Sequence, residues 1–392
     1  MTAGSRGDVE PFVALARAAR RAGHTVRVAA PDNSGVAADG IDLVSLGVDY
    51  SHLIQAQGVS VRAAIANYRG AVKPAMRKVI VEPARIALDF RPDVVVAHPK
   101  VLSAPLIAAT LDIPHVLVEM VPAVTPTRAF AAAGTVTADL GPLNRLTYRA
   151  ASGAAALFRR DLREAAGLLG TRVPRRPAPP AATLLPISPA LLPRPDDWPP
   201  SVHLTGPWHD TAPASARLPT EIAAFVEAGP FAYAGFGSMA AGDPRERARA
   251  VVDAARRAGH RLLMATGLGG LAVADDLRGE DLLVVDMVPH DLVLPRAVAA
   301  IHHGGIGTVQ AALRAGTVSI VVPFIADQPF WGALLHRRAL GPAAIPARRL
   351  TADRLDDALA AAPRYAAAVA EVAARMPHDR GTDAALEVIA GS

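Results

Sequence analysis

A glycine-rich turn between an apolar strand and an Ala-rich helix is the first place where this sequence could do chemistry. The turn begins with His302 and His303 and continues through the run Gly304–Thr308. In such a turn, backbone N–H groups and the positive helix end meet where an anion such as a phosphate can bind. The turn is not a Walker motif, because it lacks the Lys, and it is not G-x-G-x-x-G, because Gln310 replaces the third glycine. Spacing alone therefore leaves two alternatives, a phosphate site and a plain tight turn.

We expect different roles for the two histidines of this turn. His303 lies at the mouth of the glycine run, and its imidazole can donate a hydrogen bond to a phosphate oxygen, which favours the phosphate site. His302 ends the apolar strand, so we expect it to face the core and to hydrogen-bond the backbone.

A carboxylate and an amide follow the next apolar strand, which runs from Val318 to Phe324. Asp327 and Gln328 come directly after it, and the βαβ geometry brings them to the same sheet edge as the glycine turn. Together they are suited to hydrogen bonds with sugar hydroxyls. The alternative is that Asp327 caps a helix that begins before Pro329.

Asp8 is a third candidate, because it follows Gly7 at the start of the first expected helix. A helix cap accounts for it without any function. As a general base it would need a raised pKa, since a free Asp with a pKa of about 3.9 is a weak proton acceptor at neutral pH.

Composition limits the class of protein. The chain has 392 residues, of which 51% are hydrophobic, and a formal net charge of +5 carried almost entirely by Arg. This is typical of a high-GC bacterium such as an actinobacterium, and no basic run with interleaved aromatics indicates nucleic-acid binding. The chain contains no cysteine, which excludes disulfides and thiolate chemistry. It shows no signal-peptide pattern and no apolar run of about 20 residues, so we expect a cytoplasmic protein with at most peripheral membrane contact.

The elements that must position these residues alternate between strand and helix, which predicts an α/β fold with parallel, doubly wound sheets. The alternation stops in a segment rich in Pro, Ala, Ser and Thr and then restarts. We therefore expect an N-terminal domain over 1–205, a linker over 206–219 and a C-terminal domain over 220–392 that ends in helices. Two Rossmann-like domains explain such a linker better than a single barrel does.

The N-terminal half begins unusually. A glycine-containing loop that leads into a helix should follow a strand, but only Met1, Thr2 and Ala3 precede this one. The first strand usually lies in the middle of such a sheet. We expect the true start codon to lie upstream, so that the half-sheet either has a gap or closes up around it.

Four stretches taken together resemble bacterial members of glycosyltransferase family 1. They are G-S-R-G-D-V-E-P from Gly4, F-G-S-M from Phe236, H-H-G-G-I-G-T from His302 and A-D-Q-P-F-W from Ala326. The resemblance runs nearly end to end and implies the GT-B fold, two facing Rossmann-like domains with a donor site in the C-terminal half. Three stretches, P-T-R-A-F, L-N-R-L-T-Y and P-F-W, resemble the sterol glucosyltransferases most. The glycopeptide and macrolide antibiotic glycosyltransferases are close seconds.

The resemblance also implies a role for each candidate residue. Asp8 corresponds to the base that takes the proton from the acceptor hydroxyl, and Val288 to a contact with the nucleobase. Asp327 and Gln328 correspond to contacts with the hexose. The donor diphosphate would be bound by a larger set, namely Ser238, His303, Gly305, Gly307 and Thr308. The resemblance implies a hexosyltransferase that inverts the anomeric centre and uses neither a metal nor a cofactor.

The sequence does not decide which nucleotide sugar is the donor or which molecule is the acceptor. The plant-type enzymes carry a ribose-binding Glu eight positions after the phosphate-binding His, whereas this chain has Ala311, so both UDP and dTDP sugars are possible donors. Our first choice is UDP-glucose with a sterol or similar lipid, and our second is a dTDP-deoxysugar with a natural-product aglycone. The segments 50–90 and 119–148 would line the acceptor cleft. Two alternatives are a GT-B sugar-nucleotide epimerase and a non-catalytic, truncated chain that binds nucleotide sugars as a partner protein.

Overall fold

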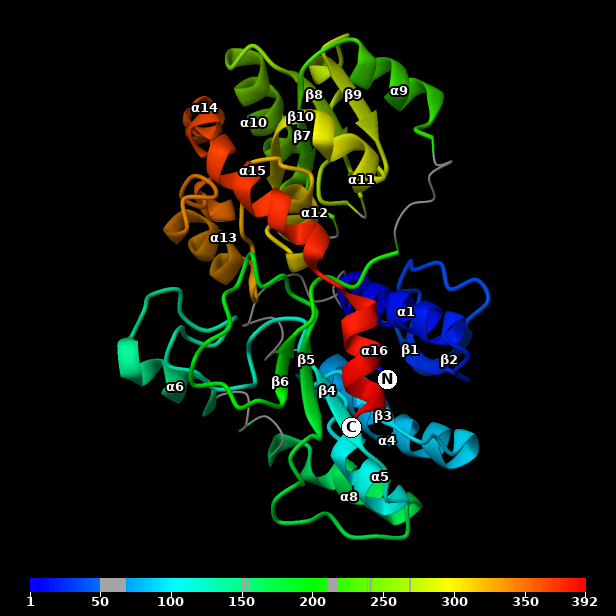
Figure 1. Ribbon diagram of the computed structural model, residues 1–392. Coiled ribbons are helices and arrows are strands. Elements are labelled where there is room, and N and C mark those ends of the chain that lie inside the picture. The colour runs from blue at the N-terminus through cyan, green and yellow to red at the C-terminus, as the bar shows by residue number, and fades with distance from the viewer. Residues whose placement is uncertain are drawn as a thin grey trace. The chain divides into compact units, whose positions relative to one another are not determined.

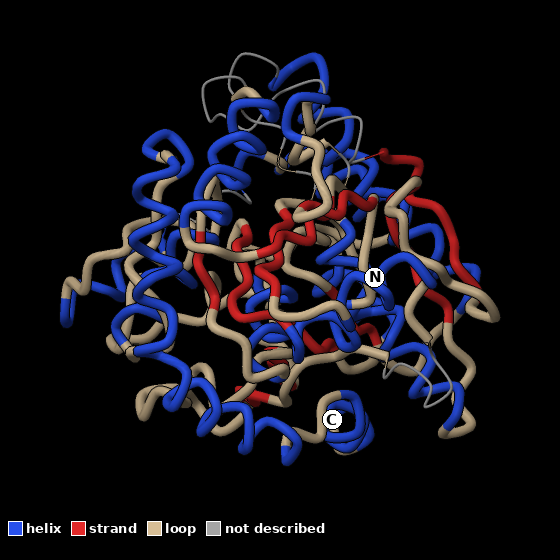
Figure 2. The backbone as a smooth tube through the Cα atoms, turned by 90° about the horizontal axis from the view of Figure 1, so that it is seen from above, coloured by secondary structure: helices blue, strands red, loops and turns tan. Residues whose placement is uncertain are grey.

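The chain forms two compact units in a computed structural model (Figure 1). The described residues are 1–49, 68–149, 153, 156–210, 217–237, 239, 242–267 and 269–392. The first unit comprises Met1–Asp210 and Asp379–Ser392, and the second comprises Thr211–His378. Helices surround the strands of both units (Figure 2), as expected for doubly wound sheets.

Every strand pair described in the first unit is parallel. One sheet has the order β1-β2 and the other has the order β3-β4-β5-β6. The strands are β1 (Arg27–Asp32), β2 (Asp42–Asp49), β3 (Val95–Ala97), β4 (His115–Val118), β5 (Ala182–Leu185) and β6 (Val202–Leu204).

The first residues of the chain lie between these two sheets. The Thr2 N–H donates to the Ala29 carbonyl of β1 at 2.9 Å. On the other side, the Met1 amino group donates to the Val96 carbonyl of β3 at 2.8 Å. Met1–Ala3 therefore bonds to both neighbours at the position of a first strand, and the order matches the 3-2-1-4 arrangement of Rossmann-like folds. The expected gap is bridged by this short segment.

A capping residue marks the start of the first helix of this unit. Helix α1 starts after Ser5, whose N–H is accepted by the Asp8 carboxylate at 2.8 Å, as in a capping box. Its buried face includes Val9, Phe12 and Val13 at helical spacing. The helices are α1 (Arg6–Arg21), α4 (Lys73–Phe90), α5 (Ala104–Leu111), α6 (Asn144–Thr147), α8 (Arg159–Leu168) and α16 (Thr382–Ala390).

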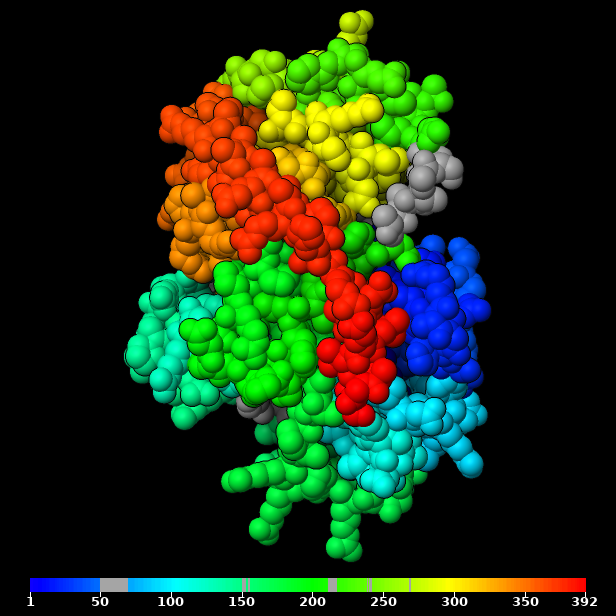
Figure 3. Space-filling model, in the orientation of Figure 1, coloured from blue at the N-terminus to red at the C-terminus, as the bar shows by residue number. Residues whose placement is uncertain are grey.

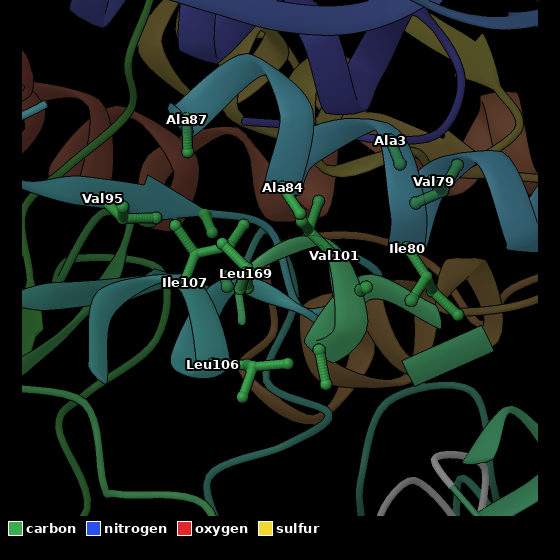
Figure 4. Packing of buried hydrophobic residues seen from close by; sticks show 14 of the residues in the cluster. Ala3, Val79, Ile80, Ala84, Ala87, Val95, Val101, Leu106, Ile107 and Leu169 are labelled. Atoms are coloured by element: carbon green, nitrogen blue, oxygen red, sulfur yellow. The ribbon is translucent and has the colours of Figure 1, made fainter. Parts of the chain in front are cut away.

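The core of this unit forms where α4 and α5 cover the sheet. Val95, Ile107 and Leu169 converge there (Figure 4). Ile107 is fully buried, which contributes about 1.5–3 kcal/mol to the stability of the fold. This packing holds β3 and the loop that follows it in place.

The C-terminal helix α16 belongs to the first unit, although the sequence suggested a boundary that places everything after residue 220 in the second domain. Ala385 of α16 is fully buried in a cluster with Phe12 of α1 and Trp208. Figure 3 shows the C-terminal residues in red beside the N-terminal residues in blue. The small side chain of Ala385 allows this close packing, which a hydrophobicity pattern does not reveal.

The second unit contains a five-stranded parallel sheet of order β11-β10-β7-β8-β9. Its strands are β7 (Phe231–Gly235), β8 (Arg261–Ala265), β9 (Leu282–Val285), β10 (Ala297–His302) and β11 (Ser319–Val321). All residues of β7 are buried, as expected for a central parallel strand covered on both faces. The helices are α9 (Thr220–Glu227), α10 (Pro244–Arg257), α11 (His290–Val293), α12 (Ile306–Arg314), α13 (Gln328–Arg337), α14 (Ala352–Ala361) and α15 (Ala366–Arg375).

Within the part of the chain that the structure describes, none of the helices has the length and apolar character needed to cross a membrane.

Candidate functional site

The strand order of the second unit places a binding site before any side chain is considered. The chain adds β8 and β9 on one side of β7 and then adds β10 and β11 on the other side. The switch point therefore lies between β7 and β10, which are neighbours in the sheet. Ligands of such folds bind at the carboxyl ends of the strands next to this switch point. The loops that leave these two ends begin at Phe236 and at His303, so the predicted donor residues that follow β10 lie at this edge.

The two histidines of the glycine turn occupy different environments. His302 is fully buried, and its Nδ1 accepts the Gly304 N–H at 3.1 Å, which confirms that it faces the core. His303 is only partly buried, and its Nδ1 has no hydrogen-bond partner among the described residues. Burial lowers the pKa of His303 to about 4, against an opposing hydrogen bond with the Gly235 backbone. His303 is therefore neutral at pH 7. Because the Gly235 backbone accepts the single N–H of the neutral ring, the second nitrogen would donate to an anion once it takes up a proton.

The glycines of the turn are required for different reasons. Gly304 has a φ of +88°, and a Cβ there would lie 2.6 Å from Val321 Cγ1. A Cβ on Gly305 would lie 2.5 Å from His303 Nε2. Gly307 is exposed in the first turn of α12, and a Cβ there would meet nothing within 4 Å. Protein packing thus explains the first two glycines but not Gly307, which leaves space for a ligand at the helix N-terminus.

The predicted sugar contacts already have partners within the second unit. Asp327 Oδ2 accepts the Trp331 indole N–H at 2.8 Å. Gln328 is buried, and its Oε1 accepts the N–H groups of Phe324 and Ile325 at 2.8 and 3.1 Å. Gln328 therefore orders the loop after β11, and Trp331 orients the Asp327 carboxylate through Oδ2.

Arg247 was not identified from the sequence, yet it links the loops at this sheet edge. Its Nε donates to the Gly270 carbonyl and its Nη2 to the Met239 carbonyl, both at 3.1 Å. Its guanidinium lies 5.2 Å from the centre of the Phe324 ring. Burial lowers the pKa of this Arg, but it remains charged at neutral pH. The positive charge of Arg247, buried among these three loops, favours the binding of an anion at the carboxyl ends of the strands.

Three donor candidates remain. Thr308 is partly buried in the first turn of α12. Val288 is partly buried against the core of the second unit, in the loop before α11. Ser238 lies outside the described residues.

The first unit has a switch point of its own, and Asp8 lies beside it. The segment Met1–Ala3 leads to Asp8, and β3 leads to His98 and Lys100. Asp8 Oδ1 lies 3.3 Å from His98 Nε2, and Asp8 Oδ2 lies 3.4 Å from Lys100 Nζ. Asp8 caps α1, which confirms the structural alternative, and its role as a base stays a prediction.

These neighbours determine the charge of Asp8. Burial alone would raise the pKa of its carboxyl group, but the charge of Lys100 and the hydrogen bond from His98 lower the pKa below its ordinary value. Burial also lowers the pKa of His98. The sequence-based expectation was that a base at position 8 would need a raised pKa, and the structure instead gives a carboxylate that is ionised throughout the neutral range.

Sequence reasoning assigned no role to His98 or Lys100. The signal was present, because His98 directly follows a buried strand, and the carboxyl ends of parallel strands meet at the ligand-binding edge.

A buried carboxylate orders the loop after β4. Glu119 is fully buried and accepts the N–H groups of Val124 and Thr125 at 2.9 and 3.2 Å. Burial raises the pKa of Glu119. The loop belongs to the segment 119–148, which the sequence assigns to the acceptor.

Two domain families match the chain. The glycosyltransferase family 28 N-terminal domain matches residues 1–121, and the erythromycin biosynthesis protein CIII-like C-terminal domain matches residues 273–389. The solved glycosyltransferase of kitacinnamycin has a TM-score of 0.71 at 20% sequence identity, covering 98% of this chain and 96% of that one. The calicheamicin glycosyltransferase CalG4 has a TM-score of 0.71 at 18% identity, covering 99% and 96%. These likenesses establish the GT-B fold.

Curated relatives are more similar in sequence. O-mycaminosyltylonolide 6-deoxyallosyltransferase of Streptomyces fradiae is 31% identical, over 91% of this chain and 87% of its own length. Vancomycin aglycone glucosyltransferase of Amycolatopsis orientalis is 30% identical, over 92% and 88%. A sterol 3-beta-glucosyltransferase of Arabidopsis thaliana is 32% identical over 91% of this chain, which spans only 59% of that relative's length.

Proposed function

Since the chain belongs to the GT-B glycosyltransferases of the sterol and antibiotic type, we propose that it transfers a hexose from a nucleoside-diphosphate sugar to a hydroxyl group of a lipophilic acceptor. Glucose is the favoured sugar, because the plant and vancomycin relatives are both named glucosyltransferases. A UDP-glucose donor with a sterol-like acceptor is the first choice. A dTDP-deoxysugar with a natural-product aglycone is the second, supported by the name of the Streptomyces relative.

The observation that carries this proposal is the unfilled space at Gly307. A glycine inside a helix costs about 0.5–1 kcal/mol relative to Ala, and no atom of the described residues lies within 4 Å of the position that a Cβ would take at Gly307. A diphosphate that binds the backbone N–H groups of Gly307 and Thr308 would need the space that a side chain at position 307 would fill, which explains the glycine. His303 at the same mouth supplies a side-chain donor.

The proposed reaction proceeds in one displacement. The acceptor oxygen forms a bond to the anomeric carbon as its proton passes to the Asp8 carboxylate. The bond between that carbon and the diphosphate breaks, and its electron pair leaves with the diphosphate. Attack opposite the leaving group inverts the anomeric centre. His303 and the N-terminus of α12 stabilise the charge of the departing diphosphate, so the proposal assigns no step to a metal or resident cofactor.

A matrix of donors and acceptors tests the proposal. UDP-glucose and dTDP-deoxysugars are each incubated with sterols and with polyketide and glycopeptide aglycones, and the products are read by mass spectrometry. We expect addition of one hexose in at least one pair. The proposal fails if no pair gives a product and calorimetry detects binding of neither UDP nor dTDP.

A further inference from the structure

The Asp8 carboxylate is held on both of its oxygens by groups from two segments of the first unit. Oδ1 faces His98 Nε2 at 3.3 Å. Oδ2 accepts the Ser5 N–H at 2.8 Å and lies 3.4 Å from Lys100 Nζ. Both basic residues lie in the loop that follows β3.

The hydrogen bonds of His98 determine which nitrogen carries its proton. Its Nδ1 accepts the backbone N–H of Lys100 at 3.1 Å, so Nδ1 supplies a lone pair. The neutral ring therefore carries its hydrogen on Nε2, which donates to Asp8. His98 cannot take a proton from an acceptor through Nε2, because that nitrogen has no lone pair available.

Lys100, unlike the buried His98, is partly exposed to solvent. Its side chain is 42% exposed, and its 3.4 Å contact with Asp8 is long for an ion pair with good hydrogen-bond geometry. The contact is part-buried and long, and the Lys100 end of it reaches solvent, so an incoming hydroxyl group can take the place of the ammonium at Oδ2.

We propose that His98 and Lys100 are positioning residues for Asp8, in which His98 fixes Oδ1 and Lys100 holds Oδ2 until an acceptor hydroxyl takes its place. This inference rests on the proposed function. The hydroxyl proton then moves to Oδ2 as the acceptor oxygen bonds to the anomeric carbon, and the diphosphate leaves with the electron pair. The histidine orients the carboxylate as a neutral donor, and the carboxylate is the group that accepts the proton.

The electrostatic surroundings of Asp8 make this inference testable by titration. Burial raises the pKa of Asp8, while Lys100, His98 and the Ser5 N–H lower it. Removal of Lys100 or His98 takes away a group that lowers the pKa of Asp8. The effect of burial then outweighs more of what remains, so this pKa rises.

Two further charges lie on the first two turns of α1. Arg6 and Glu10 are exposed and form an ion pair at 3.1 Å with each other.

The experiment compares the pH dependence of kcat/KM for hexose transfer in matched variants. Lys100→Met and His98→Leu each remove one partner, whereas Lys100→Arg and His98→Gln keep a donor at the same position. We expect the acidic limb of the profile to move to higher pH by about one unit in Lys100→Met and in His98→Leu. The limb should move furthest in the double variant and stay near its original position in the conservative variants.

A second readout does not depend on activity. The carboxyl carbon resonance of Asp8, assigned with Asp8→Asn, is titrated in the donor-free protein, and its midpoint should rise in the same order of variants. If Lys100→Met leaves both the profile and the midpoint unchanged, or if Lys100→Arg shifts them equally, the inference is overturned. Failure of wild-type protein to transfer any hexose would contradict the proposed function instead, and the titration would still test the inference.

Discussion

The Trp331 indole N–H donates a 2.8 Å hydrogen bond to Asp327 Oδ2, one turn earlier at the start of α13. Trp331 is fully buried, so this bond fixes a carboxylate that is only partly buried itself. Trp331 therefore does more than pack against its neighbours. The bond makes it the residue that orients the predicted sugar contact.

Trp331→Phe should therefore affect stability and sugar recognition together. Loss of a hydrogen bond to a charged group lowers the free energy of unfolding by about 2 kcal/mol, measured by chemical denaturation. Calorimetry should show a larger loss of affinity for the nucleoside-diphosphate sugar than for the nucleoside diphosphate. Equal losses for the two ligands would contradict the orienting role.

Gly307→Ala should stabilise the protein while it weakens donor binding. The added Cβ meets no protein atom within 4 Å, so stability should rise by about 0.4–1 kcal/mol. The methyl group would occupy the space assigned to the diphosphate, and affinity for it should fall by about tenfold.

Gly167 of α8 provides the matched control, because a Cβ there also meets nothing within 4 Å. Gly167→Ala should give a similar gain in stability with unchanged nucleotide affinity. A Gly307→Ala variant that binds the diphosphate like wild type would remove the main support for the donor site.

Diphosphate binding should depend on pH through His303. Burial lowers the pKa of this residue to about 4 in the free protein, and the negative charge of a bound diphosphate raises it. The complex then binds more protons than the free protein, so affinity increases as the pH falls toward that pKa. Calorimetry in buffers of different ionisation enthalpy should detect proton uptake for the diphosphate and little for the free nucleoside.

His303→Gln tests the assignment, because Gln keeps a hydrogen-bond donor but does not titrate. The uptake should disappear in this variant. If the same number of protons is taken up without His303, another group is responsible.

Much of the fold follows from the sequence, because continuous apolar strands that alternate with helices can only form parallel, covered sheets. The sheet edge that carries the candidates was also predictable, since the carboxyl ends of parallel strands share it. His98 could have been found from its place after a buried strand, but the contacts of His98 and Lys100 with Asp8 depend on distances across the sheet, which no spacing in the chain encodes. The packing of α16 on the first unit was missed for the same reason.

Gly4→Ala should lower kcat for hexose transfer without changing the affinity for the donor. Gly4 has a φ of +144°, and a Cβ there would lie 1.9 Å from Asp8 Oδ2 and 2.7 Å from Lys100 Nζ. The carboxylate would have to move, so kcat for hexose transfer should fall by at least about 100-fold. Gly7→Ala is the control, because its Cβ would meet only Ser5 Oγ at 4.0 Å. Comparable rates in the two variants would show that the position of the Asp8 carboxylate does not matter.

The central claim is that Asp8 accepts the proton of the attacking hydroxyl group, and the most direct measurement is the rate of hexose transfer by Asp8→Asn in the best donor–acceptor pair. Asn keeps the size of the side chain but is not basic. Glu10→Gln, a change of the same kind at an exposed residue of α1, is the control. We predict that kcat falls by about 10²–10⁴-fold in Asp8→Asn, with unchanged calorimetric affinity for the nucleoside diphosphate and a wild-type rate in the control. Transfer by Asp8→Asn at the wild-type rate would contradict the claim.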